Sequence, residues 1–164
     1  MSDSAFPDLS RIVDANLYTF PPRGGDFLDT LQQLIDQCLP GTIGLKLLSM
    51  KPEVCRASLD YHVKTAGLHG LMHGGTIFAA GDTLTALMLL FHMSEHTRNV
   101  LTSGARIRYL RPVPRNTTVE LEARLLDRTA DRFKTVCDFF DSARKRVARA
   151  NYDYILVDRA EFRT

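Results

Sequence analysis

Apolar and polar residues follow two different periods along the chain, one typical of helices and one typical of strands. Over residues 26–39 apolar residues recur every three or four positions, which predicts an amphipathic helix that begins near its first residue and is stopped at Pro40. Residues 44–50 and 54–62 are predicted as two strands, because apolar and polar residues alternate in the second of them. Residues 1–25 hold prolines and glycines without either period and are predicted to be an irregular N-terminal arm.

The middle of the chain is the most apolar part, and the remainder alternates with period two. A turn rich in glycine and histidine, 67–75, opens a long segment without proline that is predicted to be a helix reaching about Glu95. Four further strands, joined by short turns into a predicted meander, follow around 105–109, 119–125, 133–140 and 147–157. Over 26–164 the order of elements indicates a single α+β domain in which one antiparallel sheet packs on a central helix.

The long helix is apolar on all its sides. At about 100° per residue, one stripe of small and apolar residues is predicted to lie on the sheet, with Gly81 allowing a close approach: Ile77, Gly81, Leu84, Met88 and Phe91. The opposite side, around Asp82, is apolar as well: Phe78, Ala79, Ala86 and Leu89. Because one sheet covers only one side of a helix, the pattern predicts a homodimer with this helix near the interface.

Composition excludes several classes of protein. The 164 residues are 45% hydrophobic and 24% charged, and the formal net charge of +2 offers no support for a nucleic-acid partner. The apolar window 79–93 is shorter than the ~20 residues of a membrane span, and the N-terminal residues have no apolar signal core. Three cysteines without CxxC spacing indicate reduced thiols. We therefore expect a cytoplasmic protein without a membrane partner.

Two features of the helix suggest chemistry. A lone carboxylate, Asp82, in a partly desolvated crevice can act as a base near neutral pH, although it can equally pair with an arginine across a dimer. The sequence His73-Gly74-Gly75 at the start of the helix leaves backbone N–H groups unobstructed, and these can bind a carbonyl oxygen that gains negative charge during acyl transfer. The simpler alternative is a tight turn that requires glycine.

The spacing of these two features adds a condition. Gly75 and Asp82 are seven residues apart, which corresponds to ~10 Å along a helix. A base and an N–H donor that act on the same carbonyl carbon cannot be separated by that distance. A site that uses both must take the N–H from one subunit and the carboxylate from the other.

These residues resemble the signature of the hotdog-fold acyl-CoA thioesterases, specifically their PaaI-like, phenylacetate-pathway group. The resemblance rests on His73-Gly74-Gly75, on Asp82 nine residues after the histidine, on the following Thr83, and on the strand 102–112 that ends in Tyr-Leu-Arg-Pro. It covers roughly residues 48–157.

The resemblance implies a fold, a reaction and a set of roles. It implies a sheet wrapped around a long helix, with an extra N-terminal helix here, and subunits that form dimers or dimers of dimers. It implies hydrolysis of an acyl- or aryl-CoA thioester without a cofactor or metal. Asp82 would be the general base or nucleophile, the Gly74 N–H would polarise the carbonyl, His73 would orient that end and Thr102 would lie near the attacking water. Substrate-binding roles would fall to Gly75, Thr83, His69, Arg106, Arg108 and Arg111, with Arg115 as a further candidate for the CoA phosphates.

Three alternatives remain open from the sequence. Members of the group often carry asparagine six residues before the histidine, where this chain has Gly67, so that His69 or Thr65 takes that role or the role is absent. A catalytically weak acyl-CoA-binding module and a hotdog hydratase or dehydratase are therefore rival functions. The pairs His69-x3-His73 and His92-x3-His96 have the spacing of metal ligands, but no third ligand accompanies them.

Overall fold

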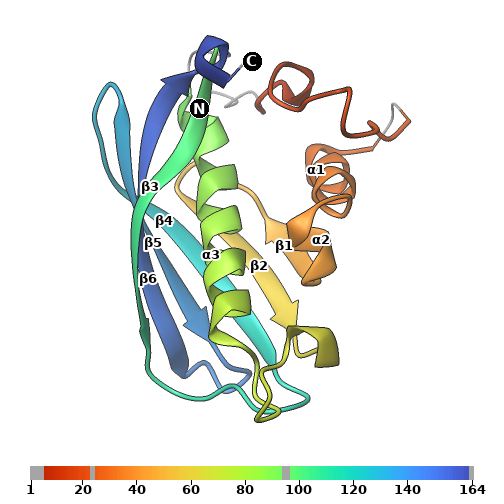
Figure 1. Ribbon diagram of the computed structural model, residues 1–164, viewed down its shortest axis with the longest axis vertical. Coiled ribbons are helices and arrows are strands. Elements are labelled where there is room, and N and C mark those ends of the chain that lie inside the picture. Colours follow the sequence, from red (N-terminus) through yellow and green to blue (C-terminus); the bar gives the residue numbers. More distant parts are fainter. Residues whose placement is uncertain (1–5, 23–24, 94–96, 163–164) are drawn as a thin grey trace.

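A computed structural model describes residues 6–22, 25–93 and 97–162, and it shows one antiparallel sheet curled around a long helix, α3 (Figure 1). In this part of the chain the sheet has six strands: β1 Leu45–Ser49, β2 Val54–Asp60, β3 Arg98–Tyr109, β4 Thr118–Arg128, β5 Arg132–Phe140 and β6 Arg146–Asp158. The helices are α1 Phe27–Ile35, α2 Leu39–Thr42 and α3 Gly74–Leu89, with short 3-10 turns at Leu9–Arg11, Val63–Thr65, Leu90–His92 and Arg159–Phe162. The predicted α+β hotdog arrangement is confirmed.

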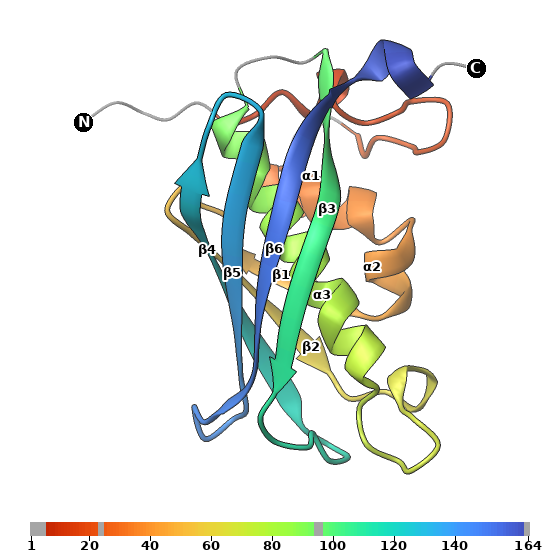
Figure 2. The same ribbon diagram turned by 60° about the vertical axis from the view of Figure 1, so that its left-hand side comes forward.

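The order of strands in the sheet differs from the predicted meander. The order is β1-β2-β4-β5-β6-β3, so β4, β5 and β6 form a meander but β3 lies beyond β6 at the edge (Figure 2). Alternation along a strand identifies its two faces but carries no information about its neighbours, which is why the predicted position of β3 was wrong. Its outer edge pairs with no other strand in the described ranges.

The stripe of α3 that faces the sheet matches the predicted one over most of its length. Ile77, Leu84 and Met88 are at most 3% exposed. At Gly81 the helix approaches the sheet so closely that a Cβ atom would lie 2.5 Å from both Phe139 Cζ and the Tyr152 hydroxyl oxygen. Glycine at this position is therefore required by packing rather than by backbone conformation.

Replacing Gly81 with alanine is expected to destabilise the protein. Both atoms that the new methyl group would meet belong to fully buried rings, Phe139 and Tyr152, which cannot move aside without disturbing the core. Overpacking of this kind costs about 1–3 kcal/mol. Urea denaturation of Gly81→Ala should show this loss, and unchanged stability would contradict the close approach. Alanine at Gly104, where the nearest atom to a Cβ is 3.8 Å away, is the matched control.

The N-terminal helical region is two helices rather than the single predicted helix 26–39. Asp26 caps α1 as expected, because its carboxylate accepts a hydrogen bond from the Asp29 N–H at 2.8 Å. The helix ends at Ile35, and Pro40 lies in the first turn of α2 instead of stopping α1. Proline is tolerated there because the N–H groups of a first helical turn have no intrahelical partner.

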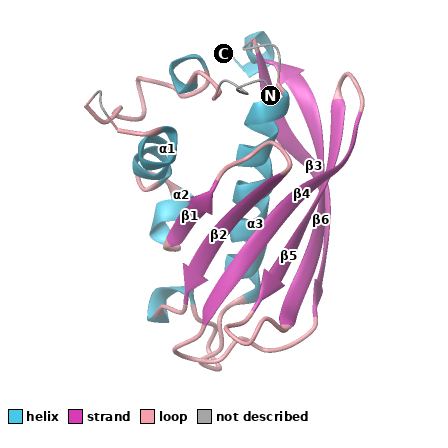
Figure 3. Cartoon of the chain, turned by 180° about the vertical axis from the view of Figure 1, so that it is seen from behind, coloured by secondary structure: helices cyan, strands magenta, loops and turns pink. Residues whose placement is uncertain are grey.

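The N-terminal segment, residues 6–22 together with α1, lies beside the upper half of α3, as Figures 1 and 3 show from opposite sides. Phe27 of α1 packs against Phe91 with ring centroids 5.8 Å apart, and Phe6 stacks on Phe27 at 4.6 Å. Phe91 is thus half-buried under this segment and does not lie on the sheet, whereas Leu89, predicted for the opposite side, is fully buried. Part of the cover that the sequence pattern assigned to a second subunit is supplied by the chain itself.

The helix also has the length and hydropathy of a membrane span. Counted with the turn after it, Gly74–His92 is the one segment among the described residues that meets this description. Its sheet-facing side chains are buried inside the domain, so it is the core helix. The predicted end near Glu95 falls on residues 94–96, which lie outside the described ranges; α3 itself ends at Leu89.

The three cysteines are free thiols. Cys55 and Cys137 are buried, and burial raises the pKa of Cys55 to about 11 and the pKa of Cys137 well above its ordinary value. Because the thiolate is the reactive form of cysteine, these two side chains stay unreactive near neutral pH. They will not interfere with an assay that follows release of a free thiol.

Candidate active site

The Asp82 carboxylate is half-buried on α3 and is held through one of its two oxygens. The Thr102 hydroxyl on β3 donates a hydrogen bond to Asp82 Oδ1 at 2.7 Å. The Tyr154 hydroxyl on β6 lies 3.1 Å from the same oxygen and 2.8 Å from the Asp82 carbonyl oxygen. No described residue donates a hydrogen bond to Oδ2. The carboxylate is therefore fixed in orientation with one oxygen left for a ligand.

Tyr154 stays protonated and keeps its hydroxyl as a donor. Burial, and next the negative charge of Asp82, raise the pKa of Tyr154 far above the ordinary value for a tyrosine. Its oxygen also lies 2.6 Å from the hydroxyl of Thr85, which in turn donates to the Gly81 carbonyl at 2.8 Å. This chain of hydroxyl groups fixes Tyr154 against the helix.

A β-bulge in β3 directs Thr102 at Asp82. The register shifts between Thr102 and Gly104, so Ser103 is an extra residue in the ladder with β6. Strict alternation would turn Thr102 and Tyr109 to opposite faces of the sheet, because their numbers differ by an odd count. With the bulge both side chains face α3, which lets one strand contact the helix at two points.

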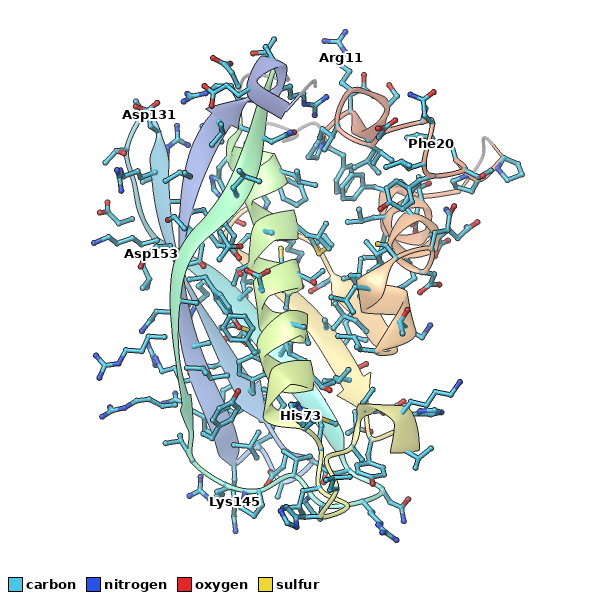
Figure 4. All side chains as sticks on the ribbon, in the orientation of Figure 1. Arg11, Phe20, His73, Asp131, Lys145 and Asp153 are labelled. Atoms are coloured by element: carbon cyan, nitrogen blue, oxygen red, sulfur yellow. The ribbon has the colours of Figure 1, made fainter. Side chains whose placement is uncertain are left out.

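The second contact of β3 lies at the start of α3, where His73 is the N-cap residue (Figure 4). His73 Nδ1 accepts a hydrogen bond from the Gly75 N–H at 2.9 Å, and the Tyr109 hydroxyl donates to the Gly74 carbonyl oxygen at 2.7 Å. The Gly74 N–H has no hydrogen-bond partner in the part of the chain that the structure describes. It points out of the positive end of the helix dipole and can bind an oxyanion.

The backbone N–H groups of Gly74 and Gly75 are therefore not equally available to a ligand. Gly75, predicted to bind substrate, has its N–H occupied by the His73 cap. His73 caps the first turn of the helix, and its orienting role stays a prediction. Along the helix Gly74 and Asp82 are eight residues, or ~12 Å, apart, so one chain does not bring them together.

An apolar pocket of about 480 Å³ lies between α3, β3 and the N-terminal segment, and Asp82 forms part of its wall. The α3 side is lined by Thr83, Ala86, Leu87 and Leu90. The N-terminal side is lined mainly by apolar residues: Leu9, Ile12, Val13, Leu31, Leu34 and Ile35. The volume falls in the range of roughly 300–1,000 Å³ that is usual for small-molecule sites.

Hydrogen bonds from Arg159 hold the N-terminal segment over this pocket. Its guanidinium donates to the carbonyl oxygens of Arg11 at 2.6 Å and Ile12 at 3.1 Å. It also donates to Asn99 Oδ1 at 2.9 Å, which ties the segment to the start of β3. The otherwise apolar pocket wall accordingly includes the polar side chains of Arg159 and Asn99 as well as Asp82.

The remaining predicted residues are distributed over other parts of the surface. Thr83 lines the pocket, and His69 is exposed in the turn before α3. Arg111 donates to the Arg146 carbonyl oxygen, near the start of α3. Arg106 and Arg108 lie with Arg149 and Asn151 on the outer face of the sheet, away from Asp82 of the same chain.

The position expected to carry asparagine is part of the turn and not of the pocket. Gly67 packs against the His73 ring, where an added Cβ would lie 3.6 Å from Cδ2. Thr65 is 4% exposed, and its hydroxyl donates to the His62 carbonyl at 2.8 Å. The Thr65 hydroxyl is thus engaged within the chain, whereas the His69 side chain is exposed.

Sequence reasoning missed two tyrosines that complete this region, Tyr154 and Tyr109. In the sequence Tyr109 was noted in an alternating strand and in the Tyr-Leu-Arg-Pro motif, and Tyr154 only as a residue within the strand 147–157, so neither was assigned a role in the site. A hydroxyl group at an otherwise apolar position predicts a polar partner inside the protein. That signal does not identify Asp82 or Gly74 as the partner.

The histidine pairs do not form a metal centre in the described residues. No three histidine, cysteine, aspartate or glutamate side chains cluster there. His73 caps a helix, and His92 Nε2 lies 2.8 Å from the Pro52 carbonyl oxygen. His96, the fourth member of the two pairs, lies outside the described residues.

The fold and the site together define a hotdog domain with a carboxylate beside an apolar pocket and a free N–H at the start of its central helix. Residues 69–148 match the sequence profile of the thioesterase superfamily. The matched region contains His73, Asp82 and Thr102. No curated protein sequence matches the chain.

Solved structures share the fold at low sequence identity. The thioesterase HI1161 from Haemophilus influenzae has a TM-score of 0.77 at 18% identity, over 90% of this chain and 99% of that one. The PaaI protein of the E. coli phenylacetic acid degradation operon has a TM-score of 0.65 at 18% identity, over 72% of this chain and 83% of its own. The protein smu.793 from Streptococcus mutans, bound to acetyl CoA, has a TM-score of 0.64 at 16% identity, over 70% and 90%.

Proposed function

We propose that the protein is an acyl-CoA thioesterase that hydrolyses a thioester to a free acid and CoA. The observation that carries this proposal is the Asp82 carboxylate, held through Oδ1 by Thr102 and Tyr154 while Oδ2 stays unengaged at the wall of an apolar pocket. The likeness to PaaI and to a protein bound to acetyl CoA supports the same assignment.

The proposed reaction uses two groups of the central helix, Asp82 near its middle and Gly74 at its first residue. Asp82 takes a proton from a water molecule that attacks the thioester carbon, or attacks that carbon itself. The Gly74 N–H stabilises the negative charge that develops on the carbonyl oxygen. The C–S bond then breaks, and the leaving thiolate takes up a proton to give free CoA. Where Asp82 is the nucleophile, water then hydrolyses the acyl-aspartyl anhydride, which releases the acid and restores the carboxylate.

The site requires a second copy of the chain. The ~12 Å between Gly74 and Asp82 prevents one chain from supplying both groups to one thioester. The long unpaired edge of β3, which carries the exposed residues Leu101 and Tyr109, is a surface of the kind that pairs with another strand. We therefore propose a homodimer in which each site takes its N–H from one subunit and its carboxylate from the other.

The pocket fits the apolar part of the substrate. Between Asp82 and Leu90 it follows α3 for eight residues, or ~12 Å. With C–C bonds of ~1.5 Å in a staggered chain, this length accommodates an acyl group of about eight to ten carbons. We propose acyl chains of this medium length as the preferred substrates.

Replacing Ala86 with phenylalanine tests this assignment of the pocket. Ala86 lies one helical turn beyond Asp82 and lines the pocket, so a benzyl side chain there would fill the space next to the carboxylate. Hydrolysis of octanoyl- and decanoyl-CoA is expected to fall more than tenfold, since ~0.8 kcal/mol of binding is lost for each CH₂ excluded. Acetyl-CoA hydrolysis, which needs little of the pocket, is expected to change little.

A thiol-release assay over acetyl-, octanoyl-, decanoyl-, palmitoyl- and benzoyl-CoA supplies the measurement. Release of CoA from at least one of them by the wild-type protein supports the proposed activity. Tight acyl-CoA binding without any thiol release would instead favour the binding module, and hydration of enoyl-CoA would favour a hydratase. An equal loss with all chain lengths in Ala86→Phe would contradict the pocket assignment while leaving the activity intact.

A further inference from the structure

The apolar pocket adjoins a second hollow of about 500 Å³ at the N-terminal segment. Ala15 and Asn16 line the second hollow but not the pocket. The N-terminal segment runs across the top of Figure 1, and Figure 4 labels Arg11 and Phe20 on it. Five residues line both spaces and are called the partition: Ile12, Val13, Asp14, Asn99 and Arg159.

Arg159 holds the partition together. Its side chain donates three hydrogen bonds, to the carbonyl oxygens of Arg11 at 2.6 Å and Ile12 at 3.1 Å and to Asn99 Oδ1 at 2.9 Å. A guanidinium group can make these bonds together because its N–H donors point in fixed directions within one plane. One side chain thus joins the N-terminal segment to the start of β3 and to the turn after β6.

The other backbone hydrogen bonds of this stretch are local. The N–H groups of residues 11–13 and 17–18 donate to carbonyl oxygens three or four residues before them. The next fixed point is Thr19, whose N–H and carbonyl both bond to the Gln37 amide, at 2.9 and 2.8 Å. From Val13 to Tyr18 the segment makes no hydrogen bond to any other described part of the chain. Without the Arg159 bonds, residues 11–18 would be held to the domain by apolar contacts alone.

The partition lies about one medium-length acyl chain away from the candidate base. Asn99 precedes Thr102 by three residues on β3, which corresponds to ~10 Å, and Thr102 donates to Asp82. A staggered carbon chain covers ~10 Å with about eight carbons. An acyl group that starts beside Asp82 and follows β3 therefore reaches the partition at that length.

We propose that Arg159 determines the longest acyl chain that the pocket accepts, because it holds the partition closed. The inference rests on the proposed function, since it takes the apolar pocket as the acyl site. With the partition in place, the chain must end within the pocket of about 480 Å³. When the partition is displaced, the pocket and the second hollow become one space that accommodates a longer chain.

This limit on chain length is a property of the N-terminal and C-terminal parts of the chain. Arg159 and residues 11–16 lie outside residues 69–148, the part that matches the superfamily profile. Arg159 acts through the segment that it holds and makes no contact with Asp82, so it is a positioning residue. Its replacement is expected to change the preference for chain length rather than the chemical step.

Calorimetric titration of the full-length protein with octanoyl- and palmitoyl-CoA, in the Asp82→Asn background that suppresses hydrolysis, tests the inference. Arg159→Met keeps the length of the side chain and removes its donors. Palmitoyl-CoA should then bind about tenfold more tightly, because the outer part of its chain becomes buried, while the affinity for octanoyl-CoA changes less than about twofold. Arg159→Lys, which can still donate to the carbonyl oxygens, should keep most of the original preference.

A second substitution tests whether the gain comes from the second hollow. Ala15 is exposed and lines only that hollow, so a tryptophan there fills it without disturbing the core. Added to Arg159→Met, Ala15→Trp should remove the gain in palmitoyl-CoA binding and leave octanoyl-CoA binding unchanged. With Arg159 present, Ala15→Trp should change neither affinity.

Trypsin cleavage after Arg11 reports the position of the segment without any ligand. The Arg11 side chain is 64% exposed, but its carbonyl oxygen is bound by Arg159. Cleavage at this bond, followed by mass spectrometry, should be several-fold faster in Arg159→Met than in the wild-type protein, whereas both should unfold cooperatively. An unchanged rate would show that Arg159 does not hold the segment and would overturn the inference.

The binding experiment has two further outcomes against the inference. It is overturned if neither acyl-CoA binds saturably or if Arg159→Met leaves the ratio of the two affinities unchanged. It is also overturned if Ala15→Trp does not remove the gain. Absence of thiol release from the wild-type protein, with the length limit still present in binding, would refute the proposed activity and support this inference.

Discussion

The variant Asp82→Asn is expected to lose hydrolysis of acyl-CoA by about 10²–10⁴-fold, the contribution usual for a general base. Asparagine keeps the size of the side chain, and its amide oxygen can still accept the hydrogen bond that Thr102 donates to Asp82 Oδ1. It cannot accept a proton from water or attack a carbonyl carbon. The loss should therefore appear in kcat, with little change in KM. The thiol-release assay measures both.

The matched control for this variant is Thr102→Val, which removes one hydrogen bond to the carboxylate and keeps the carboxylate itself. We expect an intermediate loss, since Tyr154 still contacts Oδ1. Asp82→Asn should retain the wild-type molecular mass in solution and cooperative unfolding. Full activity in Asp82→Asn would show that thioester hydrolysis does not use this carboxylate.

The variant Gly74→Pro is expected to reduce hydrolysis by about 10²–10³-fold, because it removes the N–H that would stabilise the oxyanion. Proline is acceptable at the first position of a helix, so α3 should still form. A Cβ at this position would lie 2.9 Å from both Cζ and the hydroxyl oxygen of Tyr109, and that side chain must shift in any variant. Gly74→Ala causes the same shift but keeps the N–H, so the difference between the two variants reports the N–H alone.

Mixing these two inactive proteins tests the shared site directly. A heterodimer of Asp82→Asn and Gly74→Pro has one site with both mutations and one site with neither. After unfolding and refolding together, a random mixture should regain about one quarter of wild-type activity, since half of the dimers carry one intact site of two. If both groups of a site came from the same chain, every site would carry a mutation and no activity would return.

The sequence alone predicted the central helix, its contact stripe and the positions of most strands, because each follows from a local period. Gly81 was correctly assigned to a close helix–sheet contact, since glycine lowers the stability of a helix interior and is favoured there where packing leaves no room for a side chain. Asp82 and Thr102 were named as partners in one site through the resemblance, and the structure brings them within hydrogen-bond distance. Their cooperation with Gly74 of a second chain stays a prediction.

What the sequence could not reveal depends on contacts between distant segments. The pairing of β3 with β6 joins residues about fifty positions apart, and no local pattern encodes it. The bulge at Ser103 interrupts an alternation that is regular on the side toward Tyr109. Strict alternation would place Arg106 and Arg108 on the same face as Thr102. Because the bulge cannot be read from the sequence, their position on the outer face could not be predicted.

The single extra residue in β3 affects how this chain can be compared with its relatives. Removing Ser103 would restore one uninterrupted alternation, and Thr102 and Tyr109, then six positions apart, would still point to the same face of the sheet. A homologous chain with an interval of the same length but no bulge cannot keep both the hydroxyl contact to Asp82 and the one to Gly74, whereas a chain one residue shorter and without the bulge can. The length of this interval, taken together with the presence or absence of a bulge, is thus a criterion for recognising chains that share the site as well as the fold.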